Sequence, residues 1–306
     1  PDASHRQSGF DDYMMKGALK ALETIQKACD VKSVNVVGYC LGGTLLNCML
    51  SWLHSKGRQS EVASATYLTT LVDFSEAGDL KVFIDEPQIK ALEKRMEEKG
   101  YLEGQEMALT FNLLRPVDLI WSFVVQNYLL GKDPAPFDLL YWNTDTTRMP
   151  AKMHSFYLRQ MYLNNRLAEP NALELSGEKM DLTQITTPSY LLATKEDHIA
   201  PWKSVYKAMS HYKGETKFVL SESGHIAGVI NSPMRGKYGF WLNDNKDNDA
   251  DSWFDGAEKQ QGSWWLNWQK WLAKKSGVKC AAREIGAAGF SEIEPSPGRY
   301  AKVKSD

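Results

Sequence analysis

The chain has 306 residues, of which 43% are hydrophobic and 24% are charged, a mixture typical of one large globular domain or a domain with a sizeable insertion. Its formal net charge of −2 gives no electrostatic reason to expect nucleic acid or an anionic membrane surface as a partner. No apolar run approaches the roughly 18 to 20 residues that a membrane span needs, so we expect a soluble protein without a membrane span.

The four cysteines are Cys29, Cys40, Cys48 and Cys280. None belongs to a C-x-x-C pair or to a grouping with histidine at metal-ligand spacing, so we expect no metal site and no cofactor. So few cysteines in so long a chain do not suit a disulfide framework, and this favours a reducing, cytoplasmic setting.

The first part of the chain predicts a helix, a strand, a tight turn and a second helix. Residues 10–28 carry apolar side chains at helical spacing, after two aspartates that suit a first turn. Residues 33–37 form a short β-branched apolar run of the kind found in buried parallel strands. A glycine-rich turn follows, and residues 44–56 are again apolar at helical period up to Gly57, a natural residue to end a helix.

The pattern changes after the next predicted strand, at residues 63–71. From 76 to 186, helical stretches rich in leucine, methionine and aromatic residues alternate with proline-containing loops, and no strand is evident. Strand-like runs return at 189–194 and 216–220. We therefore predict a mostly parallel sheet that carries a helical insertion.

The nucleophile-elbow pattern G-x-S-x-G, with cysteine in place of serine, is matched by Gly38-Tyr39-Cys40-Leu41-Gly42. In such a turn the nucleophile lies between strand and helix, and the two glycines leave room for both. The positive end of the following helix favours a thiolate, and the backbone N–H of Leu41 is placed to donate to an oxyanion. On the alternative interpretation, Cys40 is a small buried side chain in a turn that needs glycine for backbone reasons alone.

A cysteine nucleophile needs a base, and the base needs an orienting group. In α/β hydrolases the order along the chain is nucleophile, acid and histidine, with the last two on loops after later strands. Asp197 follows the strand at 189–194, and His225 follows the strand at 216–220. Because open α/β sheets build their sites at the carboxyl ends of strands, we predict a triad of Cys40, Asp197 and His225 on an α/β-hydrolase-type sheet.

On this fold the chain divides into three parts. Residues 1–75 form the first part of the core with the elbow, 76–186 form a helical cap insertion, and 187–306 form the second part of the core with the acid and histidine loops. We expect the insertion to lie over Cys40 and to restrict access to it.

Three other side chains compete for roles in the site. Glu196 and His198 flank Asp197, and Asp73 follows the second predicted strand. We interpret His198 as a residue that stabilises its loop, with an accessory role in the site as the alternative. Asp73 precedes the insertion, which makes it a weaker candidate for the acid than Asp197.

Several motifs together resemble polyhydroxyalkanoate synthases, over nearly the whole chain and most of all the class I, short-chain enzymes. In chain order these motifs are Gly38-Tyr39-Cys40-Leu41-Gly42-Gly43-Thr44, Phe111-Asn112-Leu113-Leu114-Arg115-Pro116, Glu196-Asp197-His198-Ile199-Ala200-Pro201-Trp202, Ser223-Gly224-His225-Ile226-Ala227-Gly228-Val229-Ile230-Asn231 and Gly262-Ser263-Trp264-Trp265.

The resemblance implies an acyltransferase that polymerises (R)-3-hydroxyacyl-CoA, such as 3-hydroxybutyryl-CoA, and releases CoA. It also implies a helical cap over the site, a homodimer, and residence at the surface of polyester granules in the cytoplasm. Carried over by position, Cys40 is the nucleophile that bears the acyl group, His225 is the base, and Asp197 is the third member, which also helps to activate the incoming hydroxyl.

Two rival functions remain open on the sequence. A cysteine-dependent α/β hydrolase, such as a thioesterase or a dienelactone-hydrolase-like enzyme, would pass the acyl group to water, and the motifs alone do not separate it from a transferase. An inactive granule-coating relative would keep the fold and lose the activity, but an intact Cys40, Asp197 and His225 argue against it.

Six of the ten tryptophans lie between Trp241 and Trp271. Trp264, Trp268 and Trp271 share one face of a predicted helix. We interpret them as a stripe that faces the core, the alternative being a surface that binds polymer or granules.

The short segment before Cys40 raises a further expectation. An α/β-hydrolase sheet places several strands before the elbow, and one loop among them supplies a second oxyanion N–H. The helix at 10–28 and the strand at 33–37 use most of the residues before Cys40. We therefore expect strands to be missing ahead of Pro1, the strand at 33–37 to lack a sheet neighbour, apolar side chains near it to be exposed, and one oxyanion donor to be absent.

Overall fold

The computed structural model describes the whole chain except residues 135–141, 143–144, 246–248, 285, 287–288 and 304–306. The chain forms two compact units. The sheet unit consists of Phe10–Lys81 and Leu158–Ser291, and the helical unit consists of Pro1–Gly9, Val82–Tyr157 and Glu292–Asp306.

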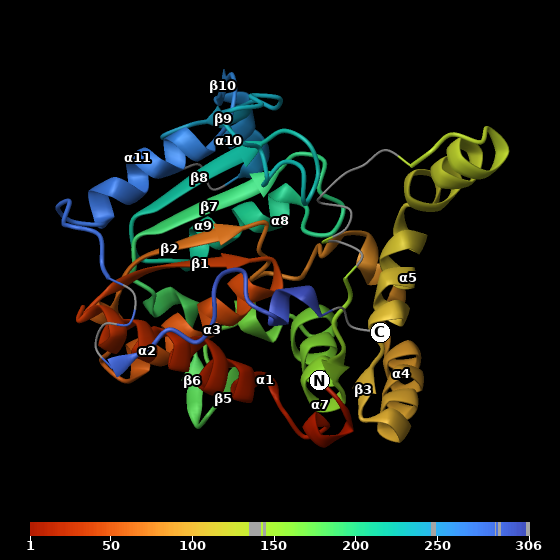
Figure 1. Cartoon of the computed structure of the whole chain (residues 1–306), viewed down its shortest axis with the longest axis horizontal. Coiled ribbons are helices and arrows are strands. Elements are labelled where there is room, and N and C mark those ends of the chain that lie inside the picture. The colour runs from red at the N-terminus through yellow and green to blue at the C-terminus, as the bar shows by residue number, and fades with distance from the viewer. Residues whose placement is uncertain (135–141, 143–144, 246–248, 285, 287–288, 304–306) are drawn as a thin grey trace. The chain divides into compact units, whose positions relative to one another are not determined.

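The sheet unit is built on six strands in the order β1-β2-β7-β8-β9-β10. The first four lie side by side in this order (Figure 1) and pair in parallel, whereas β9 and β10 are antiparallel additions. The prediction of a mostly parallel sheet is therefore confirmed. The strands are β1 (Val34–Tyr39), β2 (Val62–Leu68), β7 (Ser189–Thr194), β8 (Thr216–Ser221), β9 (Phe240–Leu242) and β10 (Glu258–Gln260).

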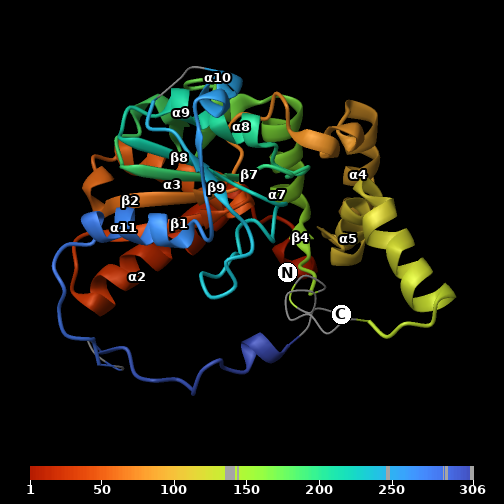
Figure 2. The ribbon, with the colours of Figure 1, turned by 90° about the horizontal axis from the view of Figure 1, so that it is seen from above.

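Each face of this sheet packs against its own set of helices. On one face, Tyr67 stacks on Tyr212 and Phe218 contacts Trp253 of α10 (Ala250–Asp255). On the other face, Tyr190 contacts Trp271 of α11 (Trp265–Lys275). Figure 2 accordingly shows α11 and α10 on opposite sides of the strands.

The predicted tryptophan stripe faces the core. Trp264 and Trp271 are only 3% and 7% exposed and belong to the hydrophobic cluster on this face, and Trp268 is packed against that cluster. The core-facing interpretation is therefore confirmed for this stripe.

The remaining helices of the sheet unit follow the sequence pattern closely. The predicted helix at 10–28 is one continuous run whose middle is π-helical, and the helix after Cys40 begins at Leu41. These elements are α1 (Phe10–Asp12), η2 (Tyr13–Leu19), α2 (Lys20–Cys29), α3 (Leu41–Ser55), η3 (Gln59–Glu61), η8 (Arg166–Ala168), η9 (Leu182–Gln184), α8 (Trp202–Tyr206) and α9 (Ala208–His211).

Strand β1 forms one edge of the sheet in the described part of the chain. It pairs with β2 on one side, and Val37 in its middle is 53% exposed. By contrast, every residue of β7, which has neighbours on both sides, is buried. The expectations that this strand lacks a neighbour and that an apolar side chain on it is exposed agree with the structure.

The helical unit consists mainly of short and medium helices with strong local signals. Asp85 caps α4 (Glu86–Lys99) by accepting from the N–H of Gln88, and Gly100 ends the helix at a φ of 88°. The other elements here are η1 (Ala3–His5), β3 (Tyr101–Leu102), α5 (Gly104–Leu114), η5 (Val117–Trp121), η6 (Val124–Leu129), β4 (Met149–Pro150), α7 (Ala151–Phe156) and η11 (Tyr300–Lys302). At the junctions with the sheet unit lie η4 (Gly78–Phe83) and η7 (Tyr157–Leu163).

The segment from 76 to 186 holds short strands that the sequence pattern does not reveal. Strands β3 and β4 pair over two residues each, and β5 (Leu173–Leu175) pairs with β6 (Glu178–Met180). Strands of two or three residues are too short to show a period of two. The sheet unit resumes at Leu158, ahead of the predicted boundary at 187.

Among the described helices, none by itself has the length and apolar character to cross a membrane. The helices Gly104–Leu114 and Val117–Leu129 meet the length and composition criteria for a membrane span only when they are taken together, and the chain bends by 108° between them.

Candidate active site

Cys40 occupies a strained turn between β1 and α3. Its backbone lies at φ 52° and ψ −123°, a conformation that residues with a Cβ rarely adopt. The Cys40 N–H donates to the Leu68 carbonyl at 2.9 Å, and its carbonyl accepts from Gly43 N–H at 2.9 Å. Because these hydrogen bonds fix the turn to β2 and to α3, the half-buried thiol is held at the carboxyl end of the sheet.

The glycines of this turn differ in how much space a side chain would have at their positions. A Cβ on Gly38 would lie 2.5 Å from the Cα of Gly43, and a Cβ on Gly43 would lie 2.0 Å from Oγ1 of Thr70. A Cβ on Gly42 would meet nothing within 4 Å. The sequence argument that gave Gly42 the spacing role is therefore wrong, and Gly43 is the residue whose missing side chain lets α3 approach β2.

Asp197 and His225 meet at the carboxyl ends of β7 and β8. The Nδ1 atom of His225 lies 2.6 Å from Oδ2 of Asp197, a short, charge-assisted hydrogen bond. The other carboxylate oxygen of Asp197 accepts from the backbone N–H groups of Ile199 and Ala200, each at 2.9 Å. The Thr194 hydroxyl also donates to Oδ2 at 3.4 Å. The buried carboxylate therefore has four hydrogen-bond partners, and it fixes the orientation of the imidazole.

The electrostatics of His225 couple it to both other members of the predicted triad. Burial alone would lower the pKa of His225, but the hydrogen bond to Asp197, with further contributions from Cys40 and from the charge of Asp197, raises this pKa to about 10. The structure therefore brings Asp197 and His225 into contact, and Cys40 is among the groups that raise the pKa of His225. The catalytic roles of the three side chains remain a prediction.

The remaining candidates take other partners. Asp73 accepts from Ser75 N–H at 2.8 Å and from the Asn165 side chain at 3.0 Å. The backbone N–H of Glu196 donates to the Ser223 carbonyl at 2.9 Å, which ties the acid loop to the histidine loop. The backbone carbonyl of His198 accepts from Asp79 N–H at 3.1 Å, and the role of the His198 side chain stays a prediction.

Leu41 is the first residue of α3. The first N–H groups of an α-helix have no acceptor inside the helix. The Leu41 N–H is thus directed out of the helix, next to Cys40, where it can donate to an oxyanion that forms at the thiol.

Sequence reasoning gave no role to Tyr39, although this residue directly precedes Cys40. Its hydroxyl donates to the backbone carbonyl of His225 at 3.0 Å, and the two rings are 5.3 Å apart. A tyrosine beside a candidate nucleophile was the available signal, but its partner lies 186 residues away. Tyr39 therefore links the elbow to the histidine loop.

Two indoles of the Gly-Ser-Trp-Trp motif hold the same loop from the other side. The Trp264 Nε1–H donates to the Gly228 and Val229 carbonyls, each at 3.1 Å, and the Trp265 Nε1–H donates to Val229 at 2.9 Å. The sequence resemblance included this motif but did not indicate its contact with the loop. The loop that carries His225 is thereby anchored to the start of α11.

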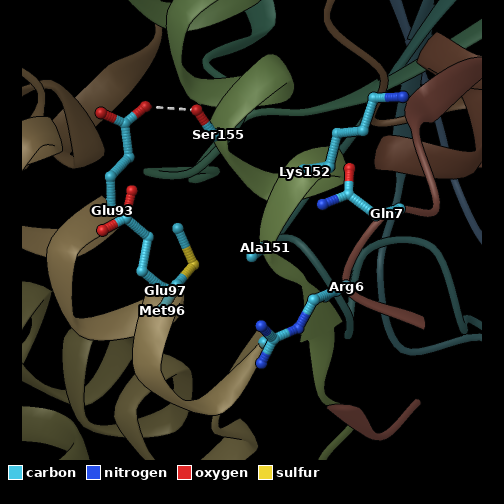
Figure 3. A pocket seen from close by; sticks show the side chains of 9 residues that line it. Arg6, Gln7, Glu93, Met96, Glu97, Ala151, Lys152 and Ser155 are labelled. Atoms are coloured by element: carbon cyan, nitrogen blue, oxygen red, sulfur yellow. Dashed lines mark hydrogen bonds between the residues drawn. The ribbon is translucent and has the colours of Figure 1, made fainter. Parts of the chain in front are cut away.

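A cavity of about 310 Å³ lies in the helical unit and contains none of the predicted site residues. Figure 3 shows Glu93 bonded to Ser155 on its wall, with Glu97 also on α4 and Lys152 on α7. In the described part of the chain, no group of three or more His, Cys, Asp or Glu side chains is placed to hold a metal ion.

Comparison with known proteins found similar proteins for the whole length of the chain. A family model described as alpha/beta hydrolase fold matches residues 2–231. A protein of Rhizobium meliloti named poly(3-hydroxyalkanoate) polymerase subunit PhaC is 48% identical over 305 residues, covering 100% of this chain and 49% of that protein. A protein of the same name from Cupriavidus necator is 42% identical over 311 residues, covering 100% and 53%.

The chain thus spans about half the length of the curated relatives it matches. Among solved structures, a putative hydrolase from Agrobacterium vitis S4 aligns with a TM-score of 0.42 and 14% identity, covering 75% of this chain and 65% of that one. The resemblance to polyhydroxyalkanoate synthases seen in the motifs is confirmed by the similarity to the two named polymerases.

Proposed function

This chain belongs to the alpha/beta hydrolase fold family, and from that premise we propose that it forms the catalytic part of an acyltransferase. The reaction is the polymerisation of (R)-3-hydroxyacyl-CoA, of which 3-hydroxybutyryl-CoA is the expected substrate, with release of CoA. The names of the relatives that are 48% and 42% identical support this substrate class. The observation that carries the proposal is the 2.6 Å contact between the His225 imidazole and the buried Asp197 carboxylate, supported by the strained elbow conformation of Cys40 and by its effect on the pKa of His225.

In the first step, His225 accepts the proton of the Cys40 thiol, and the thiolate attacks the thioester carbonyl of the substrate. The carbonyl oxygen becomes an oxyanion, to which the Leu41 N–H donates. When the carbon–sulfur bond to CoA breaks, His225 returns the proton to the leaving CoA thiolate. The products are an acyl-Cys40 thioester and free CoA, so atoms and charge balance.

In the second step, His225 accepts the proton of a 3-hydroxyl group whose oxygen attacks the acyl-Cys40 carbonyl. The new bond is an ester, the bond to sulfur breaks, and His225 returns its proton to the Cys40 thiolate. Asp197 holds the imidazole and stabilises its cationic form in both steps. We propose that Asp197 also helps to activate this hydroxyl.

A cysteine suits this sequence better than a serine. Exchange of the acyl group between two thioesters changes the free energy little, so the acyl-enzyme stays activated for ester formation. A serine ester would be a lower-energy resting state. The presence of cysteine at the elbow supports acyl transfer to a hydroxyl group. A hydrolase, which passes the acyl group to water, does not need an acyl-enzyme that stays activated for ester formation.

The whole relatives are about twice as long as this chain, so their assembly and location are likewise proposals here. We propose a homodimer that works at the surface of polyester granules in the cytoplasm. The expectation that residues 76–186 form a cap over Cys40 stays a prediction.

One assay tests the proposed reaction. The chain is given 3-hydroxybutyryl-CoA, CoA release is followed with a thiol reagent, and the acyl products are sized by chromatography. We expect CoA release to be matched by oligomers that grow with time, and both to be lost in Cys40→Ala. Release of CoA matched only by free 3-hydroxybutyrate would instead establish the cysteine hydrolase, and no acylation of Cys40 by radiolabelled substrate would refute both.

A further inference from the structure

A second cavity of about 240 Å³ lies in the sheet unit, at the end of β8 opposite to the candidate active site. Thr216 and Phe218, at the start of β8, form part of its wall, and His225 follows the other end of the same strand. Asn243, just after β9, and Trp271 and Lys274, near the end of α11, also line it. None of the predicted catalytic residues reaches this cavity.

Two buried polar atoms in this wall have no hydrogen-bond partner among the described residues. They are the indole Nε1 of Trp271 and the hydroxyl of Thr216, and each of these residues is only 7% exposed. A buried donor without an acceptor destabilises the folded state, and such groups are rare in folded proteins. Two of them in the wall of one cavity therefore point to an acceptor that the described residues do not supply.

The other tryptophans of this segment show that Trp271 is the exception. The indole N–H groups of Trp264 and Trp265 donate to the Val229 carbonyl, and that of Trp268 donates to Oγ1 of Thr66 at 2.9 Å. The other three indoles thus have acceptors within the protein, whereas the indole of Trp271, a residue that lines the cavity, has none in the described part of the chain.

The charged side chains around this cavity indicate that a ligand bound there carries negative charge. Lys275 pairs with Glu215 at 2.7 Å, and Lys217 lies 4.0 Å from Asp244. Lys274 also lines the cavity and has no ion pair within the described residues. Three lysines surround the site against two carboxylates, so it carries one cation in excess.

We infer that this cavity binds a small oxyanion, the carboxylate or phosphate group of a ligand, to which Trp271 and Thr216 donate hydrogen bonds. Lys274 supplies the compensating charge. Carboxylate and phosphate oxygens accept several donors at once and form their strongest hydrogen bonds with charged donors. The inference does not depend on the proposed catalytic function, because the site shares no residue with it.

Nuclear magnetic resonance of the chain labelled with ¹⁵N at its indoles tests this inference. The Trp271 Nε1–H signal is assigned by its loss in Trp271→Phe, and the chain is then titrated separately with inorganic phosphate and with sodium butyrate. We expect the Trp271 signal to shift and to saturate with one of them at a Kd of about 1 mM. The Trp265 signal, whose N–H is already bonded to Val229, serves as the internal reference and should stay in place.

Two variants locate the site within the fold. Thr216→Val keeps the shape of the side chain and removes the hydroxyl, and Lys274→Gln removes the charge, so each should weaken binding by about tenfold. Lys270→Gln, an exposed lysine of the same helix, is the matched control and should bind like the parent chain. Absence of a saturable Trp271 shift with both anions, or unchanged affinity in Lys274→Gln and Thr216→Val, would overturn the inference.

Discussion

Cys40 holds backbone angles that a residue with a Cβ adopts only at a cost of about 1–3 kcal/mol, whereas glycine adopts such angles freely. We therefore expect Cys40→Gly to have a free energy of unfolding about 1 kcal/mol or more above that of Cys40→Ala. Both variants lack the thiol, so the comparison isolates the backbone. Urea unfolding of the two proteins measures the difference, and equal stability would argue against strain at the elbow.

The raised pKa of His225 has a consequence for stability. Burial opposes it, but Asp197 and Cys40 bring this pKa from 6.5 to about 10. A base with a higher pKa in the folded chain adds stability that is complete below its unfolded pKa and is lost as the pH rises through its folded pKa. We expect the free energy of unfolding to fall more steeply between pH 6.5 and about pH 10 in the parent chain than in His225→Gln. Parallel pH profiles of urea unfolding would contradict this coupling.

Tyr39 acts on the site through His225. Tyr39→Phe keeps the ring contact and removes the hydrogen bond to the His225 carbonyl, so we expect the acylation rate of Cys40 to fall by about threefold to tenfold. Tyr190→Phe is the matched control, because its hydroxyl bonds to Asn267 away from the site. Both variants should lose about 1 kcal/mol of stability, but only Tyr39→Phe should slow acylation by labelled substrate and move its pH profile. Equal rates in the two variants would make Tyr39 a purely structural residue.

At the scale of the elements, the junction of β1 and α3 depends on one glycine more than on its neighbour. Gly43→Ala would drive a Cβ into Thr70, whereas Gly42→Ala meets nothing and replaces glycine in the first turn of a helix. We expect Gly43→Ala to be destabilising by about 2 kcal/mol or more and Gly42→Ala to be neutral or stabilising by up to about 1 kcal/mol. Thermal unfolding followed by circular dichroism ranks the two variants, and the reverse order would refute this account of the elbow.

The long and buried elements could be predicted from sequence, because their pattern is set by which side chains face the core. The strand at 189–194 agrees with β7 residue for residue, and the strand at 216–220 agrees with β8 within one residue. The pairs β5–β6 and β9–β10 could not, since each strand has only three residues and is defined by its partner.

Within the candidate site, too, some features could be predicted from the sequence and others could not. Asp197 and His225 follow neighbouring strands of the sheet, so their contact could be expected from order and spacing. The bond from Tyr39 to the His225 carbonyl and the clash that forbids a side chain at Gly43 depend on distances between elements far apart in sequence. No local pattern encodes those distances.

At the scale of the whole chain, the exposed edge of the sheet is the feature that we expect to affect aggregation most. Strand β1 has no neighbour on one side in the described part of the chain, and Val37 on it is 53% exposed. Exposed apolar edges invite pairing between molecules, and a lysine on an edge opposes it. We expect Val37→Lys to lower light scattering on heating while the free energy of unfolding changes by less than about 0.5 kcal/mol. Unchanged scattering would show that aggregation starts elsewhere.

The strand order β1-β2-β7-β8 also determines when the residues of the candidate site can meet during synthesis of the chain. Cys40 follows β1, but its two candidate partners follow β7 and β8, which join the sheet beside β2 only after the segment Val82–Tyr157 has been made. A chain made only up to Tyr157 therefore has neither His225 nor Asp197 beside the Cys40 thiol. On the proposed mechanism, we expect such a chain to react with acyl thioesters at Cys40 no faster than an ordinary cysteine, and the faster reaction to begin when β7 and β8 join the sheet.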